Sequence, residues 1–242
     1  MSNTQNLYSP KFIIASTLFW VIINLVSICF LAEEDSRWFR VANSLYFLIW
    51  SCSLGVLKPK INYVLIAYLI CDIALVYYEI AVFNFITFLA RSLIFFLLIF
   101  IVFPKIRSVK FNFFELILGI VVIAINIYLS FELLGMVPEA YLYNSFSPAY
   151  LMLTALTILL IGLAFTYNNR FSSRRSFYFL LGTLFLALSD VNFFIAFYLE
   201  VPSFYYPDRF FHILALGLIL LFGVTPLEGS AYNNIEQQDL KL

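Results

Sequence analysis

Charged side chains are scarce in this sequence. Asp, Glu, Lys and Arg make up 12% of its 242 residues, whereas a soluble domain carries about 25%. Hydrophobic residues make up 63% and aromatic residues 20% of the chain. A water-soluble fold cannot hide that much apolar surface. We therefore expect most side chains to face lipid or neighbouring helices.

Other shortages exclude further classes of protein. The 14 basic and 14 acidic residues cancel and form no long basic run, so nucleic acid is not an expected partner. The three cysteines, Cys29, Cys52 and Cys71, all lie inside apolar runs, which predicts neither a disulfide framework nor a zinc site. The sequence has no glycine-rich phosphate loop, zinc-protease motif or nucleophile elbow. We predict no cofactor and no metal.

What the chain does have is a series of apolar runs, each near the ~20 residues that cross a bilayer. They cover residues 12–32, 38–57, 61–80, 82–103, 113–134, 148–167, 177–199 and 209–225. The third and fourth runs are continuous, and we divide them near Glu79 and Asn84 because one helix of that length would be about twice too long. We predict an all-α polytopic transmembrane bundle of eight spans, a single domain with a polar tail at 226–242.

The basic residues indicate how this bundle is oriented. They gather in alternate connectors, whereas the other connectors are mainly acidic and hold only Arg37, Arg40 and Arg209 as bases. Because cytoplasmic loops are enriched in Lys and Arg, we expect both termini in the cytoplasm. The short connectors favour the inner membrane of a bacterium. The connector bases are Lys58, Lys60, Lys105, Arg107, Lys110, Arg170, Arg174 and Arg175.

Three ionisable residues lie well inside predicted spans: Asp72, Arg91 and Asp190. Each such residue costs at least ~2.5 kcal/mol to insert at the centre of a membrane helix, so it indicates a function by default. A neutral hydrogen-bonding role is the alternative for Asp190, which has no evident basic partner. A lone buried carboxyl of this kind is expected to stay protonated.

The third and fourth spans should form an antiparallel hairpin. Asp72 and Arg91 lie equally far from its turn, and so do Glu79 and Asn84. Each helix would therefore contribute two polar residues to one seam, with Asp72 and Arg91 as a buried ion pair. Such a pair can also serve only to neutralise itself or to fix the helix register. The single histidine, His212, is expected near the outer interface as a surface or capping residue.

The segment 180–190, which runs Leu-Leu-Gly-Thr-Leu-Phe-Leu-Ala-Leu-Ser-Asp, resembles the most recognisable segment of the YhhN-like, or lysoplasmalogenase, membrane protein family. Cys71-Asp72 is similar to a Gly-Asp pair in the third span of that family. The eight-span organisation extends the resemblance over nearly the whole chain. Arg91 stands where the family usually has a histidine, and the family's Tyr- and Gln-containing final span is here Phe211, His212 and apolar residues.

The resemblance implies cleavage of the vinyl ether bond of lysoplasmalogens, membrane lipids of the lysophospholipid type. By similarity Asp72 and Asp190 would form the catalytic carboxyl pair, with Asp190 as general acid and Asp72 orienting water. Arg91 would hold Asp72 ionised or meet the lipid phosphate. Further candidate substrate contacts are Glu79, Asn84 and Ser189.

Two other functions stay open. One is a noncatalytic family member that binds lipid or a partner. The other is a transporter of small solutes or protons, which would be favoured by helix-breaking Gly or Pro in facing spans. No such residue lies near Asp72, and only Gly182 precedes Asp190 in its span.

Overall fold

The computed structural model describes residues 10–54, 59–106, 113–138 and 142–226. Within these ranges the chain forms eight α-helices and one short 3₁₀ helix, η2, and no strand. The predicted all-helical class is therefore confirmed. The elements are α2 Pro10–Phe30, α3 Glu33–Leu54, α4 Pro59–Val76, α5 Ala81–Ile106, α6 Phe113–Gly135, α7 Phe146–Phe171, α8 Arg174–Tyr198, η2 Pro202–Phe204 and α9 Tyr205–Val224.

Each predicted apolar run corresponds to one helix. The chain turns between Val76 and Ala81, where the third and fourth runs were divided. Five helices are long and apolar enough to cross a membrane, namely α2, α5, α7, α8 and the stretch Pro202–Val224 formed by η2 and α9. This finding supports an integral membrane protein. The acidic first turn and the arginines of α3 lower its hydropathy, which separates it from those five.

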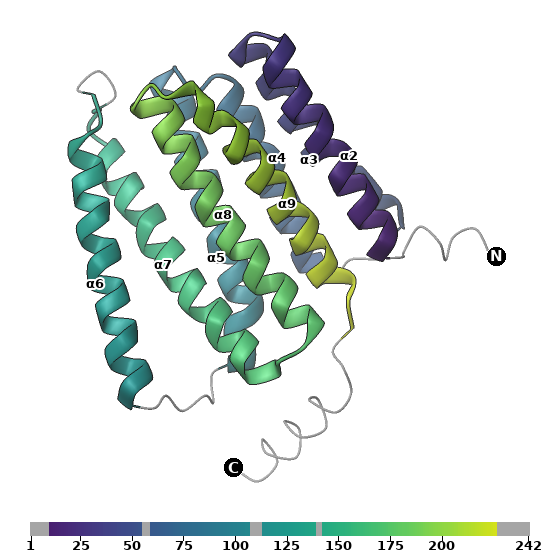
Figure 1. Cartoon of the computed structure of the whole chain (residues 1–242), viewed down its shortest axis with the longest axis vertical. Helices are drawn as coiled ribbons and strands as arrows, with labels where there is room; N and C mark the ends of the chain where they lie inside the picture. Colours follow the sequence, from purple (N-terminus) through teal and green to yellow (C-terminus); the bar gives the residue numbers. More distant parts are fainter. Residues whose placement is uncertain (1–9, 55–58, 107–112, 139–141, 227–242) are drawn as a thin grey trace, which may run out of the picture.

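The helices pack as an elongated bundle (Figure 1). Helix α3 packs against α4, α4 against α5, α5 against α7, α7 against α8, and α8 against α9, while α2 packs against α9 and α3. Helix α6 stands at one edge and packs mainly against α7, and α2 stands at the opposite edge. The start of α2 and the end of α9 lie at the same end of the bundle.

Polar and apolar side chains are distributed as expected for a protein surrounded by lipid. Large apolar side chains such as Phe19, Ile22 and Phe96 are more than half exposed. By contrast, Arg37 and Arg40 are among the largest fully buried side chains. Because unpaired charge in lipid is costly, these arginines require partners inside the bundle.

A close helix crossing fixes α2 against α9. A Cβ atom on Gly217 would lie 2.6 Å from Cγ2 of Thr17, and closer still to its hydroxyl. The Thr17 hydroxyl donates to the Ile13 carbonyl at 2.7 Å, so it does not need a partner across the interface. Small residues permit such close backbone approach in membrane helices. Gly217 thereby brings α9, with its polar residues, against the N-terminal helix.

Candidate functional site

Arg40 on α3 is the centre of a buried polar cluster. Its Nε lies 3.3 Å from Oδ1 of Asp72 on α4, and its Nη1 lies 2.9 Å from Oδ2 of Asp208 on α9. Its Nη2 lies 2.8 Å from Nδ1 of His212, also on α9. All four side chains are at most 2% exposed. One guanidinium thus joins three helices.

The contact between Arg40 and His212 defines the state of the histidine. A guanidinium only donates hydrogen bonds, so Nδ1 of His212 accepts and carries no proton. The proton of the neutral ring is then on Nε2, which donates to Oδ2 of Asp72 at 3.4 Å and lies 3.3 Å from Oδ1 of the same carboxylate. Ser44 donates a further hydrogen bond to Oδ2 of Asp72. Every oxygen of Asp72 is therefore occupied.

Asp208 extends the cluster toward α8. Its Oδ1 accepts a hydrogen bond from the Ser189 hydroxyl at 2.7 Å, and its Oδ2 lies 3.9 Å from Nε of Arg209. Arg209 points away from the site and donates to the Ser36 carbonyl at 3.1 Å. Ser189 was predicted as a substrate contact, and its position beside Asp208 keeps that prediction open.

Arg91 on α5 pairs with Asp190 on α8, and the predicted pair between Asp72 and Arg91 is wrong. Nε and Nη2 of Arg91 both approach Oδ1 of Asp190, at 2.7 and 2.5 Å. Asp190 is therefore not the lone carboxyl that we expected. Asp72 faces α3 and α9, whereas Arg91 crosses to α8.

The predicted polar seam of Glu79 and Asn84 is also not formed. Glu79 pairs with Arg37 at 2.7 Å and is 46% exposed. Asn84 instead donates to the Tyr198 hydroxyl at 3.1 Å and accepts from the Tyr143 hydroxyl at 2.9 Å. Burial raises the pKa of Tyr143, in the connector between α6 and α7, to about 12, so this hydroxyl keeps its proton and remains a donor. Both residues therefore lie away from Asp72.

The residues that the sequence reasoning missed are Arg40, Asp208 and His212. We placed them in outer connectors or at the interface, yet they are buried at the centre of the cluster. Helical spacing contained the signal: Asp208 and His212 are four residues apart on α9, and Ser36, Arg40 and Ser44 repeat every four residues on α3. Polar residues at this spacing share one helix face. When the rest of the helix is apolar, such a polar face is expected to point toward a polar cluster inside the bundle.

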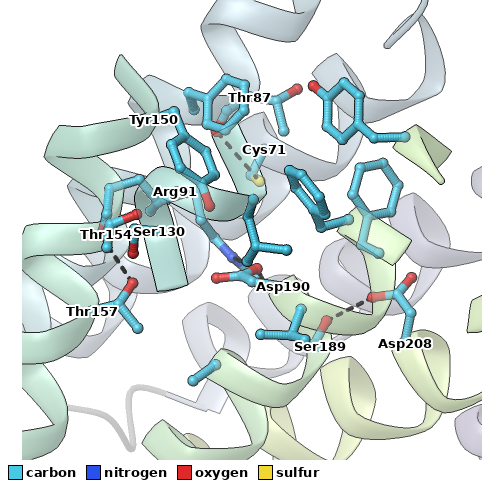
Figure 2. Close-up of a pocket in the computed structure, with 18 of the residues that line it drawn as sticks. Cys71, Thr87, Arg91, Ser130, Tyr150, Thr154, Thr157, Ser189, Asp190 and Asp208 are labelled. Carbon is cyan, nitrogen blue, oxygen red and sulfur yellow. Dashed lines mark hydrogen bonds and ion pairs between the residues drawn. The ribbon is translucent and has the colours of Figure 1, made fainter. Parts of the chain in front are cut away.

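A cavity of about 340 Å³ lies beside this cluster. Figure 2 shows Arg91 and Asp190 near its centre, Ser189 and Asp208 on one side, and the hydroxyl residues of α6 and α7 on the other. Most of the remaining wall is apolar or aromatic, with Leu133, Leu153 and Phe194 among its members. Asp72 is not among the lining residues, so the two predicted catalytic carboxyls do not share this cavity.

The ion pair between Arg91 and Asp190 leaves two of its polar atoms without a hydrogen bond. Oδ2 of Asp190 and Nη1 of Arg91 are buried and have no hydrogen-bond partner among the described residues. The Asp190 side chain is 26% exposed, whereas that of Arg91 is 5% exposed. Buried polar groups normally have partners, so a free acceptor beside a free donor indicates a place for water or a polar ligand group.

Comparison of the chain with protein-family models, curated proteins and solved structures finds no match. Across the described ranges, no three His, Cys, Asp or Glu side chains form a group that could hold a metal ion. The polar groups of the cluster and the cavity include carboxylates, guanidiniums, hydroxyls, the Cys71 thiol and the His212 imidazole.

Proposed function

We propose that the chain is a membrane hydrolase that cleaves the vinyl ether bond of a lysoplasmalogen-type lipid in this cavity. The observation that carries the proposal is the free Oδ2 of Asp190 in a largely apolar cavity. A vinyl ether is hydrolysed by proton transfer to carbon, which needs a positioned acid and a site that accepts an alkyl chain. The resemblance of segment 180–190 to the lysoplasmalogenase family also supports the proposal.

In the first step a carboxyl group protonates the vinyl ether. Asp190 takes up a proton from water on Oδ2, the oxygen that Arg91 does not contact, and gives it to the vinyl carbon that does not bear oxygen. The π electrons form the new C–H bond, and the carbon that bears oxygen becomes an oxocarbenium ion. The Asp190 carboxylate, oriented by Arg91, and the Asp208 carboxylate, oriented by Ser189 and Arg40, supply the opposing negative charge.

Water completes the reaction. It adds to the oxocarbenium carbon and returns a proton to Asp190, which gives a hemiacetal. Collapse of the hemiacetal releases the fatty aldehyde and the alcohol of the head group. Nη1 of Arg91, which is free of other partners among the described residues, can donate to this water while Oδ2 of Asp190 accepts from it. Asp72 acts as a positioning residue, because it holds Arg40 and does not line the cavity.

The test is aldehyde release by the purified protein in detergent, with a vinyl ether lysophospholipid as substrate and the saturated alkyl ether as the blank. Asp190→Asn should lower the rate at least about 100-fold, since general acid catalysis contributes about 10² to 10⁴. Because the change also leaves Arg91 without its counter-charge, the rate is measured well below the unfolding midpoint of the variant. Asp35→Asn, an exposed carboxyl at the start of α3, is the matched control and should keep full activity. Absence of aldehyde from the parent protein would overturn the hydrolase and favour a noncatalytic lipid-binding role.

We further propose that all eight helices cross the membrane, with both ends in the cytoplasm of a bacterial cell. Helices α3, α4 and α6 have 22, 18 and 23 residues, which is about 27 to 35 Å at 1.5 Å per residue. The helix ends that carry Lys60, Lys105 and Arg174 belong to the same end of the bundle as the start of α2. At the other end Arg37 and Arg209 point inward, so the surface charge asymmetry is larger than the sequence count.

A further inference from the structure

We propose that the hydroxyls of Ser130, Thr154 and Thr157 form a subsite that recognises a free hydroxyl on the glycerol backbone of the lipid. This inference rests on the proposed function, because it assigns the residues that select the substrate at the same site. All three residues line the cavity that holds Asp190 and Arg91. They come from α6 and α7, whereas Asp190 comes from α8.

The subsite faces the reacting group. Figure 2 shows Ser130, Thr154 and Thr157 together on one side of the cavity, with Arg91 between them and Asp190. A substrate whose vinyl ether meets Asp190 would therefore extend its neighbouring polar atoms toward these hydroxyls. The flanking residues of α6 and α7 that line the cavity, such as Leu129, are mostly apolar. Three hydroxyls grouped within such a wall define a polar position on the substrate.

The hydrogen bonds of these hydroxyls determine what they recognise. Ser130 donates to the Asn126 carbonyl at 2.6 Å, and Thr157 donates to the Leu153 carbonyl at 2.8 Å. Because the hydroxyl protons of Ser130 and Thr157 are already committed to their own helix, the oxygens offer lone pairs. The subsite therefore accepts hydrogen bonds and selects a donor.

The absence of charge on this wall of the cavity indicates that the hydrogen-bond donor on the substrate is a neutral group. None of the cavity-lining residues of α6 and α7 is charged, so nothing on that wall compensates an ammonium group, which is costly to desolvate without a counter-charge. A hydroxyl donates one hydrogen bond and carries no charge. A lipid whose backbone oxygen is methylated or acylated lacks the donor and leaves the acceptors unmatched.

The experiment compares two vinyl ether substrates that differ only at this backbone position, one with a hydroxyl and one with a methoxy group. The parent protein should favour the hydroxyl substrate by about tenfold or more in kcat/KM, because an unmet polar group is penalised strongly in a buried site. Thr154→Val, Thr157→Val and Ser130→Ala should each reduce that preference by about two- to tenfold, as expected for loss of one hydrogen bond. The rate on the methoxy substrate should stay nearly constant.

Thr166→Val is the matched control. Thr166 is on the same helix and donates to its own backbone, at 2.9 Å from the Gly162 carbonyl, but it does not line the cavity. This variant should keep the parental preference. Equal loss of activity on both substrates in the three cavity variants would overturn the subsite, because it would show a structural role without selectivity.

A binding measurement separates failure of the subsite from failure of the hydrolase. Saturated alkyl ether lysolipids, again as a hydroxyl and methoxy pair, can be titrated by calorimetry into the detergent-solubilised protein. A parental preference for the hydroxyl lipid that the Thr154→Val variant loses supports the subsite even if no aldehyde is ever released. Equal affinity for the two lipids overturns the subsite even if vinyl ether cleavage is observed.

Discussion

Arg40 donates a hydrogen bond from Nη2 to Nδ1 of His212 across 2.8 Å, with both side chains buried. Because of this contact, the only histidine of the chain is neutral and donates a hydrogen bond to Asp72. The Arg40 guanidinium is then the positive charge that faces the carboxylates of Asp72 and Asp208. In a membrane interior such compensation decides whether the helices can associate at all. Arg40 therefore joins α3 to α4 and α9 through charged contacts in the interior of the bundle.

Removing Arg40 should be strongly destabilising. Arg40→Leu leaves Asp72 and Asp208 buried without their principal counter-charge, and loss of one partner from a buried pair costs about 3–5 kcal/mol. Adding Asp72→Asn and Asp208→Asn to that variant should recover part of the loss, because the uncompensated charges become neutral amides. Unfolding midpoints in detergent measure both effects, with Arg174→Leu at an exposed position as the control. A triple variant no more stable than Arg40→Leu would contradict the assigned contacts.

The partner of Arg91 can be tested by a double-mutant cycle. Arg91→Gln and Asp190→Asn remove groups that lie 2.5 Å apart, so the two changes should be non-additive by about 0.5–3 kcal/mol in the free energy of unfolding. The same cycle with Asp72→Asn should be additive within about 0.5 kcal/mol. The reverse pattern would restore the hairpin ion pair expected from the sequence alone.

The helices could be predicted from the sequence because a long apolar run is a local property. The turn between Val76 and Ala81 was located for the same reason, since the combined run exceeded the bilayer thickness. The partner of Asp72 was missed because position in a hairpin gives depth but not direction around the helix axis. Which way Asp72 turns depends on α3 and α9, and its contact with His212 joins residues 140 positions apart.

The arginines near the helix ends show a second limit. Arg37, Arg40 and Arg209 were assigned to outer connectors by their positions beside acidic residues, yet all three turn inward. Hydropathy treats a charge near a helix end as solvated, because long basic side chains commonly reach the interface. Only the arrangement of neighbouring helices decides whether such a side chain finds carboxylates inside. Asp190 and Ser189, by contrast, were identified from a local segment and do line the cavity.

Packing between α2 and α9 gives the last prediction. Gly217→Ala places a methyl group 2.6 Å from Cγ2 of Thr17, and overpacking of this kind costs about 1–3 kcal/mol. Gly162→Ala is the matched control, because the added carbon has no atom within 4 Å apart from its own helix backbone and chain neighbours, and alanine favours the helix by up to about 1 kcal/mol. Thr17→Ala should rescue Gly217→Ala in part, since it removes the two nearest atoms and leaves Cβ at 3.0 Å. A Gly217→Ala protein with the parental unfolding midpoint would show that α2 does not approach α9 this closely.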